Sequence, residues 1–293
     1  TGVPHENLVQ VARALTTVPE APLPAISGCY DLLVTGVGGT GVVTVGQLIT
    51  MGAHLEGKGA SVLDFMGFAQ KFGTVISYIR IGDEPASINQ VRIEQGRADA
   101  LIGCDLVVSS SPRASVAYDP GYTRALVNTA EMTTADFVKH RDANMQAARR
   151  IKAIGDVVGK DNLSTLDANA LAERIMGDTI YANMMMVGAA WQMGLIPVSL
   201  DALMRAVELN GVKIDENRKA FTWGRIAAHA PEAIEQLSDA GANKITDTLD
   251  AMIERRRAFL TEYQDEALGE RYVELVRRVR DAEGIPVVHH IVR

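Results

Sequence analysis

Cysteine is scarce in this sequence, and its scarcity excludes two kinds of site. The 293 residues include only Cys29 and Cys104. A four-iron cluster needs four thiolates, so this chain alone cannot supply one. Neither C-x-x-C nor H-x-x-x-H occurs, so we predict no structural zinc site and no other metal site. We expect two reduced, buried thiols, with a single disulfide between them as the alternative.

Long apolar runs and a basic excess are also missing. No apolar stretch approaches the roughly 18 residues of a membrane span. Residues 1–20 lack the charged start and apolar core of a signal peptide. The net charge is −7, whereas nucleic-acid binders usually carry a basic excess. We therefore predict a cytoplasmic protein whose partners include neither a membrane nor a nucleic acid.

What the sequence does contain is a regular alternation of short apolar segments with helical ones. Hydrophobic residues make up 47% of the chain, ample for a sizeable core in one or two domains. We predict strands over 30–35, 60–65, 74–81, 106–110 and 125–128, and helices over 41–56 and 97–103. After about residue 165 the pattern is helical, over 167–176, 180–193, 200–209 and 213–229. The sequence predicts an α/β fold with a Rossmann-like, mostly parallel sheet and helices on both faces, followed by a helical C-terminal extension.

Composition also suggests where domains divide. Residues 1–29 are proline-rich, which is typical of a linker or lead-in. We predict a main domain over 30–240. Charges of both signs crowd along 243–283, with amphipathic helices predicted near 244–262 and 265–283, so we interpret 241–293 as the start of a helical extension. The sequence begins without methionine and ends abruptly, and we expect it to be a piece of a longer protein.

A glycine-rich segment, called the glycine loop below, follows the first predicted strand. Gly36, Gly38 and Gly41 have the spacing of the phosphate-binding G-x-G-x-x-G motif, with Gly39 and Thr40 between them. In that motif the first glycine permits the turn, the second lets the backbone approach a pyrophosphate, and the third lets the helix pack on the strand. Amides at the helix start then face an anion, and the threonine hydroxyl offers another donor. No lysine stands in the Walker position, which excludes a P-loop nucleotide hydrolase.

Three interpretations of this glycine loop remain open. A dinucleotide would pair with Asp64, which ends the second predicted strand near the position of a ribose-binding acid. A different phosphate-bearing ligand would use the same amides. The third is a glycine turn that holds no ligand.

Longer stretches resemble a known family. The chain is similar to the gamma domain of 2-oxoacid:ferredoxin oxidoreductases, and most similar to the long fused indolepyruvate type, over roughly residues 30–285. The similar stretches are G-V-G-G-T-G-V-V-T-V-G-Q-L-I at 36–49, G-F-A-Q-K-F-G at 67–73, the strand through Arg80, A-D-A-L-I-G-C-D-L-V-V at 98–108, the methionine-rich 182–197, and A-V-E-L-N-G-V-K-I-D-E-N-R-K-A-F-T-W-G-R at 206–225. Segments at 253–264 and 271–276 resemble the helical extension of the fused proteins.

The resemblance implies an enzyme that decarboxylates 2-oxoacids on thiamine diphosphate, passes electrons through four-iron clusters to ferredoxin, and transfers the acyl group to coenzyme A. This chain lacks the cluster cysteines and the G-D-G…N-N thiamine signature, so those cofactors are expected on other domains or subunits. We expect this part to complete the active-site cleft within a homo-oligomeric assembly, to be inactive alone, and to hold the coenzyme A pyrophosphate.

The candidate cofactor-binding residues come from the glycine loop, from the loop at 67–73 that resembles the family, and from the strand that follows it. They are Gly36, Gly38, Gly39, Thr40, Gly41, Gln70, Lys71 and Arg80, and no catalytic residue is predicted. Phe72 departs from the glycine usual in this family loop, which indicates a reshaped loop.

Two other classes of function stay as alternatives. In the first, the domain is purely architectural and packs its sheet edge and the helix carrying Met184, Met185 and Met186 against the thiamine-binding domain; exposed methionines would favour it. Three adjacent methionines are nevertheless more typical of a core. The second alternative is a stand-alone NAD-dependent oxidoreductase that uses Asp64.

Overall fold

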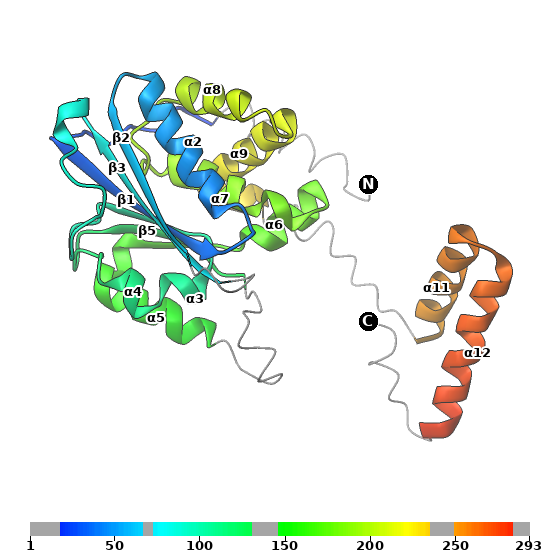
Figure 1. Cartoon of the computed structure of the whole chain (residues 1–293). Helices are drawn as coiled ribbons and strands as arrows, with labels where there is room; N and C mark the ends of the chain where they lie inside the picture. The colour runs from blue at the N-terminus through cyan, green and yellow to red at the C-terminus, as the bar shows by residue number, and fades with distance from the viewer. Residues whose placement is uncertain (1–17, 67–72, 131–145, 235–248, 284–293) are drawn as a thin grey trace. The chain divides into compact units, whose positions relative to one another are not determined.

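The computed structural model describes residues 18–66, 73–130, 146–234 and 249–283. The chain forms two compact units that divide between residues 237 and 238 (Figure 1). The first unit is a three-layered α/β structure, and the second is a pair of helices.

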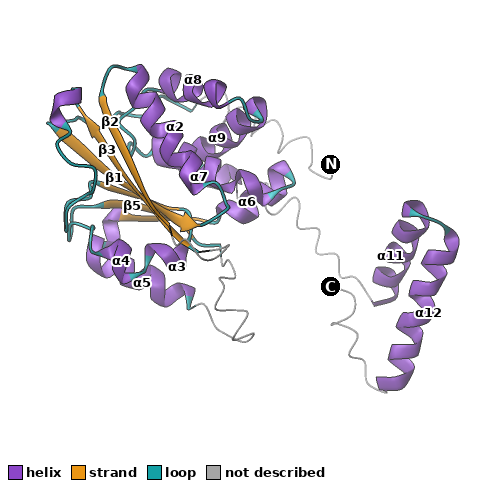
Figure 2. Cartoon of the chain, viewed as in Figure 1, coloured by secondary structure: helices purple, strands orange, loops and turns teal. Residues whose placement is uncertain are grey.

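A six-stranded sheet forms the centre of the first unit, in the order β2-β3-β1-β4-β5-β6 (Figure 2). Its strands are β1 Cys29–Val37, β2 Gly59–Met66, β3 Thr74–Gly82, β4 Ala100–Gly103, β5 Arg124–Asn128 and β6 Leu163–Leu166. β1 pairs with β4 in parallel, as do β4 with β5 and β5 with β6. β3 alone runs antiparallel, between β1 and β2.

Helices cover both faces of this sheet (Figure 1). One face carries α2 Val42–Leu55, α6 Ala168–Met176, α7 Ala182–Gln192, α8 Leu200–Asn210 and α9 Ile214–His229. The other face carries α3 Leu106–Ser109, α4 Pro112–Ser115 and α5 Ala147–Val158. Each face has its own hydrophobic core, because successive strand residues point to opposite sides. The predicted α/β class with a mostly parallel sheet is confirmed.

α7 and α9 cross with their backbones in contact. A Cβ on Gly188 would overlap the carbonyl oxygen of Phe221 and lie 2.7 Å from its carbonyl carbon, and one on Gly224 would overlap the carbonyl oxygen of Met185. Trp191 packs in the crossing, and its indole N–H donates to the Val198 carbonyl at 2.8 Å. Only glycine permits two helices to approach this closely.

The methionine run at the start of α7 is buried. Met184, Met185 and Met186 are 7%, 0% and 0% exposed. Core placement of these side chains, the reading typical of such runs, is therefore confirmed. These three methionines therefore form no exposed patch of the kind that would have favoured docking through α7, because α9 packs over α7.

Two short elements differ from the sequence prediction. Residues 97–103 were predicted as a helix and 106–110 as a strand, and both predictions are wrong: β4 occupies 100–103 and α3 occupies 106–109. Asp105 is the reason that residues 106–109 form a helix and not a strand. This residue caps α3, with Oδ1 accepting from the Val108 amide at 2.7 Å.

The second unit consists of α11 Leu249–Tyr263 and α12 Glu266–Glu283. The two helices lie against each other around Val276, and Arg257 pairs with Glu270 at 2.6 Å. The two predicted helices are confirmed from residue 249 to 283, while 244–248 lie outside the described residues. Nowhere in the described ranges is there a helix of the length and apolarity that crossing a membrane requires.

Candidate functional site

The glycine loop lies at a topological switch point of the sheet. From the carboxyl end of β1 the chain passes into α2 on one face, and from the adjacent carboxyl end of β4 it passes into α3 on the other. The two ends are joined, because the Cys104 amide donates to the Thr35 carbonyl at 2.8 Å. In open α/β sheets, such a divergence leaves a crevice where ligands bind.

The structure assigns different roles to the glycines than the motif predicts. Gly36, expected to permit the turn, provides the close helix packing, since a Cβ there would overlap Val42 and lie 3.2 Å from the Cys104 Cβ. Gly41, expected at the packing contact, is the left-handed N-cap of α2 with φ 92°. Gly39 is also left-handed, with φ 87°. The loop therefore needs glycine at all three positions, for two distinct reasons.

Two donors expected to face a ligand are already bonded to carbonyl groups of the protein. The Thr40 hydroxyl donates to the Val37 carbonyl at 2.7 Å, and the Gly38 amide donates to the Gly73 carbonyl at 2.8 Å. From α7, the Asn183 amide group donates to the Thr40 carbonyl at 2.7 Å. These bonds fix the loop shape, so the amides that follow at the start of α2 carry the anion-binding potential.

The first turns of three helices meet beside this loop. A cavity of about 210 Å³ is lined by Gly39–Gly41 and Thr44 of the α2 start, Asn183 of α7 and Asn217 of α9. The amides of Val42, Val43 and Thr44 donate to none of the described residues, as expected at a helix start, and α2 has no acidic residue in its first turn. The partial positive charges of three N-termini add here, which suits an anion. Asp215 and Glu216 in the first turn of α9 oppose that field in part.

The remaining predicted site residues are not gathered at this loop. Gln70 and Lys71 lie outside the described residues. Arg80 lies at the opposite edge of the sheet, because antiparallel β3 places it in register with Asp31 near the start of β1. The expectation that Arg80 pairs with charge beside the glycine loop is therefore wrong.

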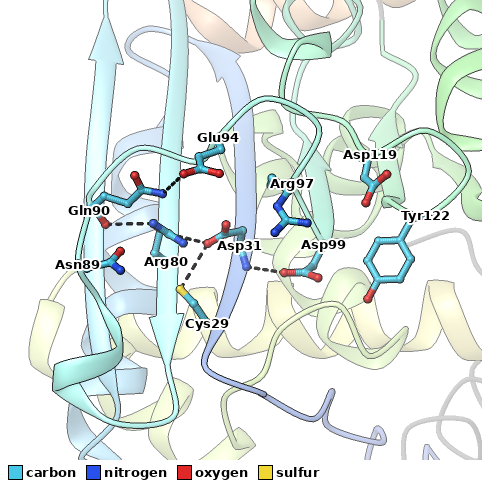
Figure 3. A pocket seen from close by; sticks show the side chains of 10 residues that line it. All are labelled: Cys29, Asp31, Arg80, Asn89, Gln90, Glu94, Arg97, Asp99, Asp119 and Tyr122. Atoms are coloured by element: carbon cyan, nitrogen blue, oxygen red, sulfur yellow. Dashed lines mark hydrogen bonds and ion pairs between the residues drawn. The ribbon is translucent and has the colours of Figure 1, made fainter.

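Arg80 instead lies in a polar cavity of about 790 Å³ at the amino end of β1 (Figure 3). Its Nε donates to the Asp31 carboxylate at 2.7 Å, and the Asp31 amide donates to Asp99 at 2.7 Å. Burial, followed by the charge of Asp31, raises the pKa of the neighbouring Cys29 thiol to about 11. Burial also raises the pKa of Asp99.

Asp64 is not placed for the ribose of a dinucleotide. In a dinucleotide-binding fold the strand bearing the acid is the neighbour of the glycine strand. Here β3 separates β2 from β1, and the Asp64 carboxylate accepts a hydrogen bond from Ser77 of β3. This geometry does not fit the NAD alternative.

The thiols do not fit an iron–sulfur cluster. Both are free, with Cys29 starting β1 and Cys104 following β4 at the opposite edge, and the sequence has no others. Burial raises the pKa of Cys104 to about 12, so this thiol is a poor metal ligand. These two thiols cannot supply the four ligands that a four-iron cluster needs.

A buried polar group at the switch point was missed by sequence reasoning. Asp105 is 1% exposed; its Oδ1 caps α3, while Oδ2 has no partner among the described residues, and burial raises the pKa of its carboxyl. Asn128, ending β5, donates to the Cys104 carbonyl at 3.2 Å and to Asn169 at 2.8 Å. The signal for Asp105 was present, since aspartate directly before a Leu-Val-Val run is an N-cap pattern.

Comparison with known proteins agrees with this architecture. A family model described as pyruvate ferredoxin/flavodoxin oxidoreductase matches residues 31–227, and a model of a family of unknown function matches 249–290. Curated relatives include the indolepyruvate oxidoreductase subunit IorB of Pyrococcus horikoshii, 27% identical over 211 residues, or 68% of this chain and 96% of the relative. The IorB subunit of Thermococcus kodakarensis is 25% identical over the same shares.

Solved structures also match this chain, at lower identity. A 2-oxoglutarate:ferredoxin oxidoreductase from Magnetococcus marinus matches with TM-score 0.52 and 16% identity, over 69% of this chain and 31% of that one. A keto/oxoacid ferredoxin oxidoreductase gamma subunit from Geobacter sulfurreducens matches with TM-score 0.46 and 23% identity, over 69% and 99%. Because the family model spans about two thirds of the sequence, from β1 into α9, the chain belongs to the pyruvate ferredoxin/flavodoxin oxidoreductase family.

Proposed function

We propose that this chain is the gamma part of a 2-oxoacid:ferredoxin oxidoreductase of the indolepyruvate type. Such an enzyme oxidatively decarboxylates a 2-oxoacid to an acyl-coenzyme A and passes the electrons to ferredoxin. Family membership and the names of the IorB relatives support the assignment. Thiamine diphosphate and the iron–sulfur clusters reside on partner domains or subunits, so this chain does not turn over alone.

Within that enzyme, the glycine loop holds the pyrophosphate of coenzyme A. The observation that carries this role is the convergence of three helix starts, with unused amides at Val42–Thr44, on one cavity at the switch point. The cavity of about 210 Å³ has room for a pyrophosphate and not for the whole coenzyme, so the rest of the ligand extends into the cleft toward the partner. The Magnetococcus enzyme is described with coenzyme A bound, but at 16% identity it supports the fold alone.

Thr44→Glu is the sharpest test, because it places a carboxylate at the third position of α2. A carboxylate there suits the helix itself, so the fold should persist while the anion site becomes negative. A unit charge about 5 Å from a phosphate at an effective dielectric constant of about 20 costs roughly 3 kcal/mol, so we expect coenzyme A binding to weaken at least tenfold. Gln47→Glu is the control, since it adds the same charge one turn further along on an exposed position.

Isothermal titration of the whole chain with coenzyme A separates the outcomes. Equal affinity in wild type and Thr44→Glu, or in Gly38→Trp, would show that coenzyme A binds elsewhere. Absence of any coenzyme A heat, in a chain whose folding is verified, would favour the architectural role. Binding of NADH that Asp64→Ala weakens would restore the dinucleotide alternative.

A further inference from the structure

A cavity larger than the one at the glycine loop lies at the other edge of the sheet. It is lined by Cys29, Asp31, Arg80, Asn89, Gln90, Glu94, Arg97, Asp99, Asp119 and Tyr122 (Figure 3). Asp31 and Val37 are six residues apart along β1, so the two sites are separated by about 20 Å. At about 790 Å³ the cavity falls in the size range of small-molecule sites.

The floor of the cavity is a buried ion pair. The side chains of Arg80 and Asp31 are 9% and 8% exposed, with 2.7 Å between Nε and Oδ1. Oδ1 also accepts from the Cys29 thiol at 3.5 Å, whereas Oδ2 has no hydrogen-bond partner among the described residues. Burying two charges in a sheet is costly, and a hydrophobic pair of similar volume would serve the sheet equally well. The pair therefore needs a reason beyond stability, and a ligand above it supplies one.

The opposite wall of the cavity carries further charged side chains of both signs. Arg97 points into the cavity between Glu94 and Asp99 in Figure 3. It has no ion pair within 4.0 Å among the residues that the structure describes. Asp99 is half-buried and already receives the Asp31 amide, and Asp119 lies beyond it with an unpaired carboxylate. The ring of Tyr122, 61% exposed, offers a face to a cation.

We propose that this cavity binds a small zwitterion with an ammonium and a carboxylate group, that is, an α-amino acid, and that it prefers basic amino acids. The carboxylate of the ligand pairs with Arg97, and its ammonium group lies against Asp99 and the free oxygen of Asp31. Four carboxylates against two guanidinium groups leave the lining with net charge −2, which disfavours an anion such as phosphate. The same excess attracts a second cation on the ligand, which Asp119 and Tyr122 receive. Two guanidinium groups in the lining distinguish the cavity from a site for simple cations.

Titration of the whole chain with L-lysine tests the proposal, with cadaverine as the probe that lacks the carboxylate. Wild type should bind lysine at least tenfold more tightly than cadaverine, and more tightly than L-glutamate. Arg97→Gln should weaken lysine binding at least tenfold and leave cadaverine unchanged. Asp99→Asn, which keeps the acceptor for the Asp31 amide, should weaken both. Arg92→Gln is the matched control, because Arg92 lies over Tyr78 outside this cavity.

Three results would overturn the proposal. These are no lysine heat at 10-millimolar ligand in a folded chain, equal affinity for lysine and cadaverine, and lysine binding that survives both Arg97→Gln and Asp99→Asn. Lysine binding should persist in Thr44→Glu, because the two sites lie at opposite edges of the sheet. This site is thus independent of the coenzyme A proposal, and either can fail alone.

Discussion

Gly188→Ala tests whether the backbones of α7 and α9 truly touch. The added Cβ would overlap the Phe221 carbonyl oxygen and lie 2.7 Å from its carbon and 3.0 Å from its Cα. These are main-chain atoms of a helix, so no side-chain rotation relieves the contact. Non-bonded carbons sit about 3.5–4.0 Å apart, so α7 and α9 must separate by about 1 Å.

The cost follows from what that separation opens. Trp191, Phe221 and Met185, all under 3% exposed, pack in the crossing and would lose contact on separation. Overpacking of a core costs about 1–3 kcal/mol, and a clash with backbone falls at the upper end. Alanine regains about 1 kcal/mol of helix propensity. We expect a net loss of about 2 kcal/mol in the free energy of unfolding.

Urea unfolding followed by tryptophan fluorescence measures this loss, because both tryptophans, Trp191 and Trp223, belong to the first unit. Gly155→Ala in α5 is the matched control: its Cβ would meet only the Leu163 side chain, at an ordinary 3.4 Å. This substitution should stabilise the unit by about 0.5–1 kcal/mol. If Gly188→Ala were as stable as wild type, the close crossing of α7 and α9 would be refuted.

Two further predictions concern titrating groups. Burial raises the pKa of Asp105 in the folded chain above its unfolded value of about 3.9, so its contribution to stability is complete below that pH and is lost as the pH rises through the folded pKa. Asp105→Asn should therefore gain stability over wild type as the pH rises from 4.5 to 8 in urea titrations, and a pH-independent difference would contradict this. Cys29, with its pKa raised to about 11 by burial and then by Asp31, should react slowly with iodoacetamide at pH 8. Asp31→Asn should accelerate the labelling of Cys29, as followed by mass spectrometry, while buried Cys104 stays unmodified. Equal rates of Cys29 labelling in wild type and Asp31→Asn would exclude an effect of the Asp31 charge.

Elements with strong local signals were predictable from the sequence. The β1–α2 unit, α6 and α8 all agree with the predicted ranges within a residue or two, because each depends on its own residues. β4 and α3 were exchanged because each spans four residues, too few for periodicity to separate a buried strand from a buried helix turn. The pair α5 and β6 was missed outright.

The site was less predictable because its residues are brought together by strand direction. Met66 and Thr74 are too close in sequence for a crossover between parallel strands, which takes a dozen or more residues, so the antiparallel β3 was deducible. That one reversal moves Arg80 to the far edge and separates Asp64 from the glycine strand. The bonds from the Gly38 amide to Gly73, just before β3, and from Asn183 of α7 to the Thr40 carbonyl join residues far apart in the sequence, so no local pattern encodes them.

The β2–β3 hairpin has a consequence for how the glycine loop is held. Its strands pair in register from Gly59 with Gly82 to Met66 with Val75, so sheet geometry is set before the connecting segment begins. Gly73, at the far end of that segment, is bonded to the mouth of the glycine loop. The position of the glycine loop is thus coupled to antiparallel β3, which begins directly after Gly73, as well as to β1, which precedes the loop.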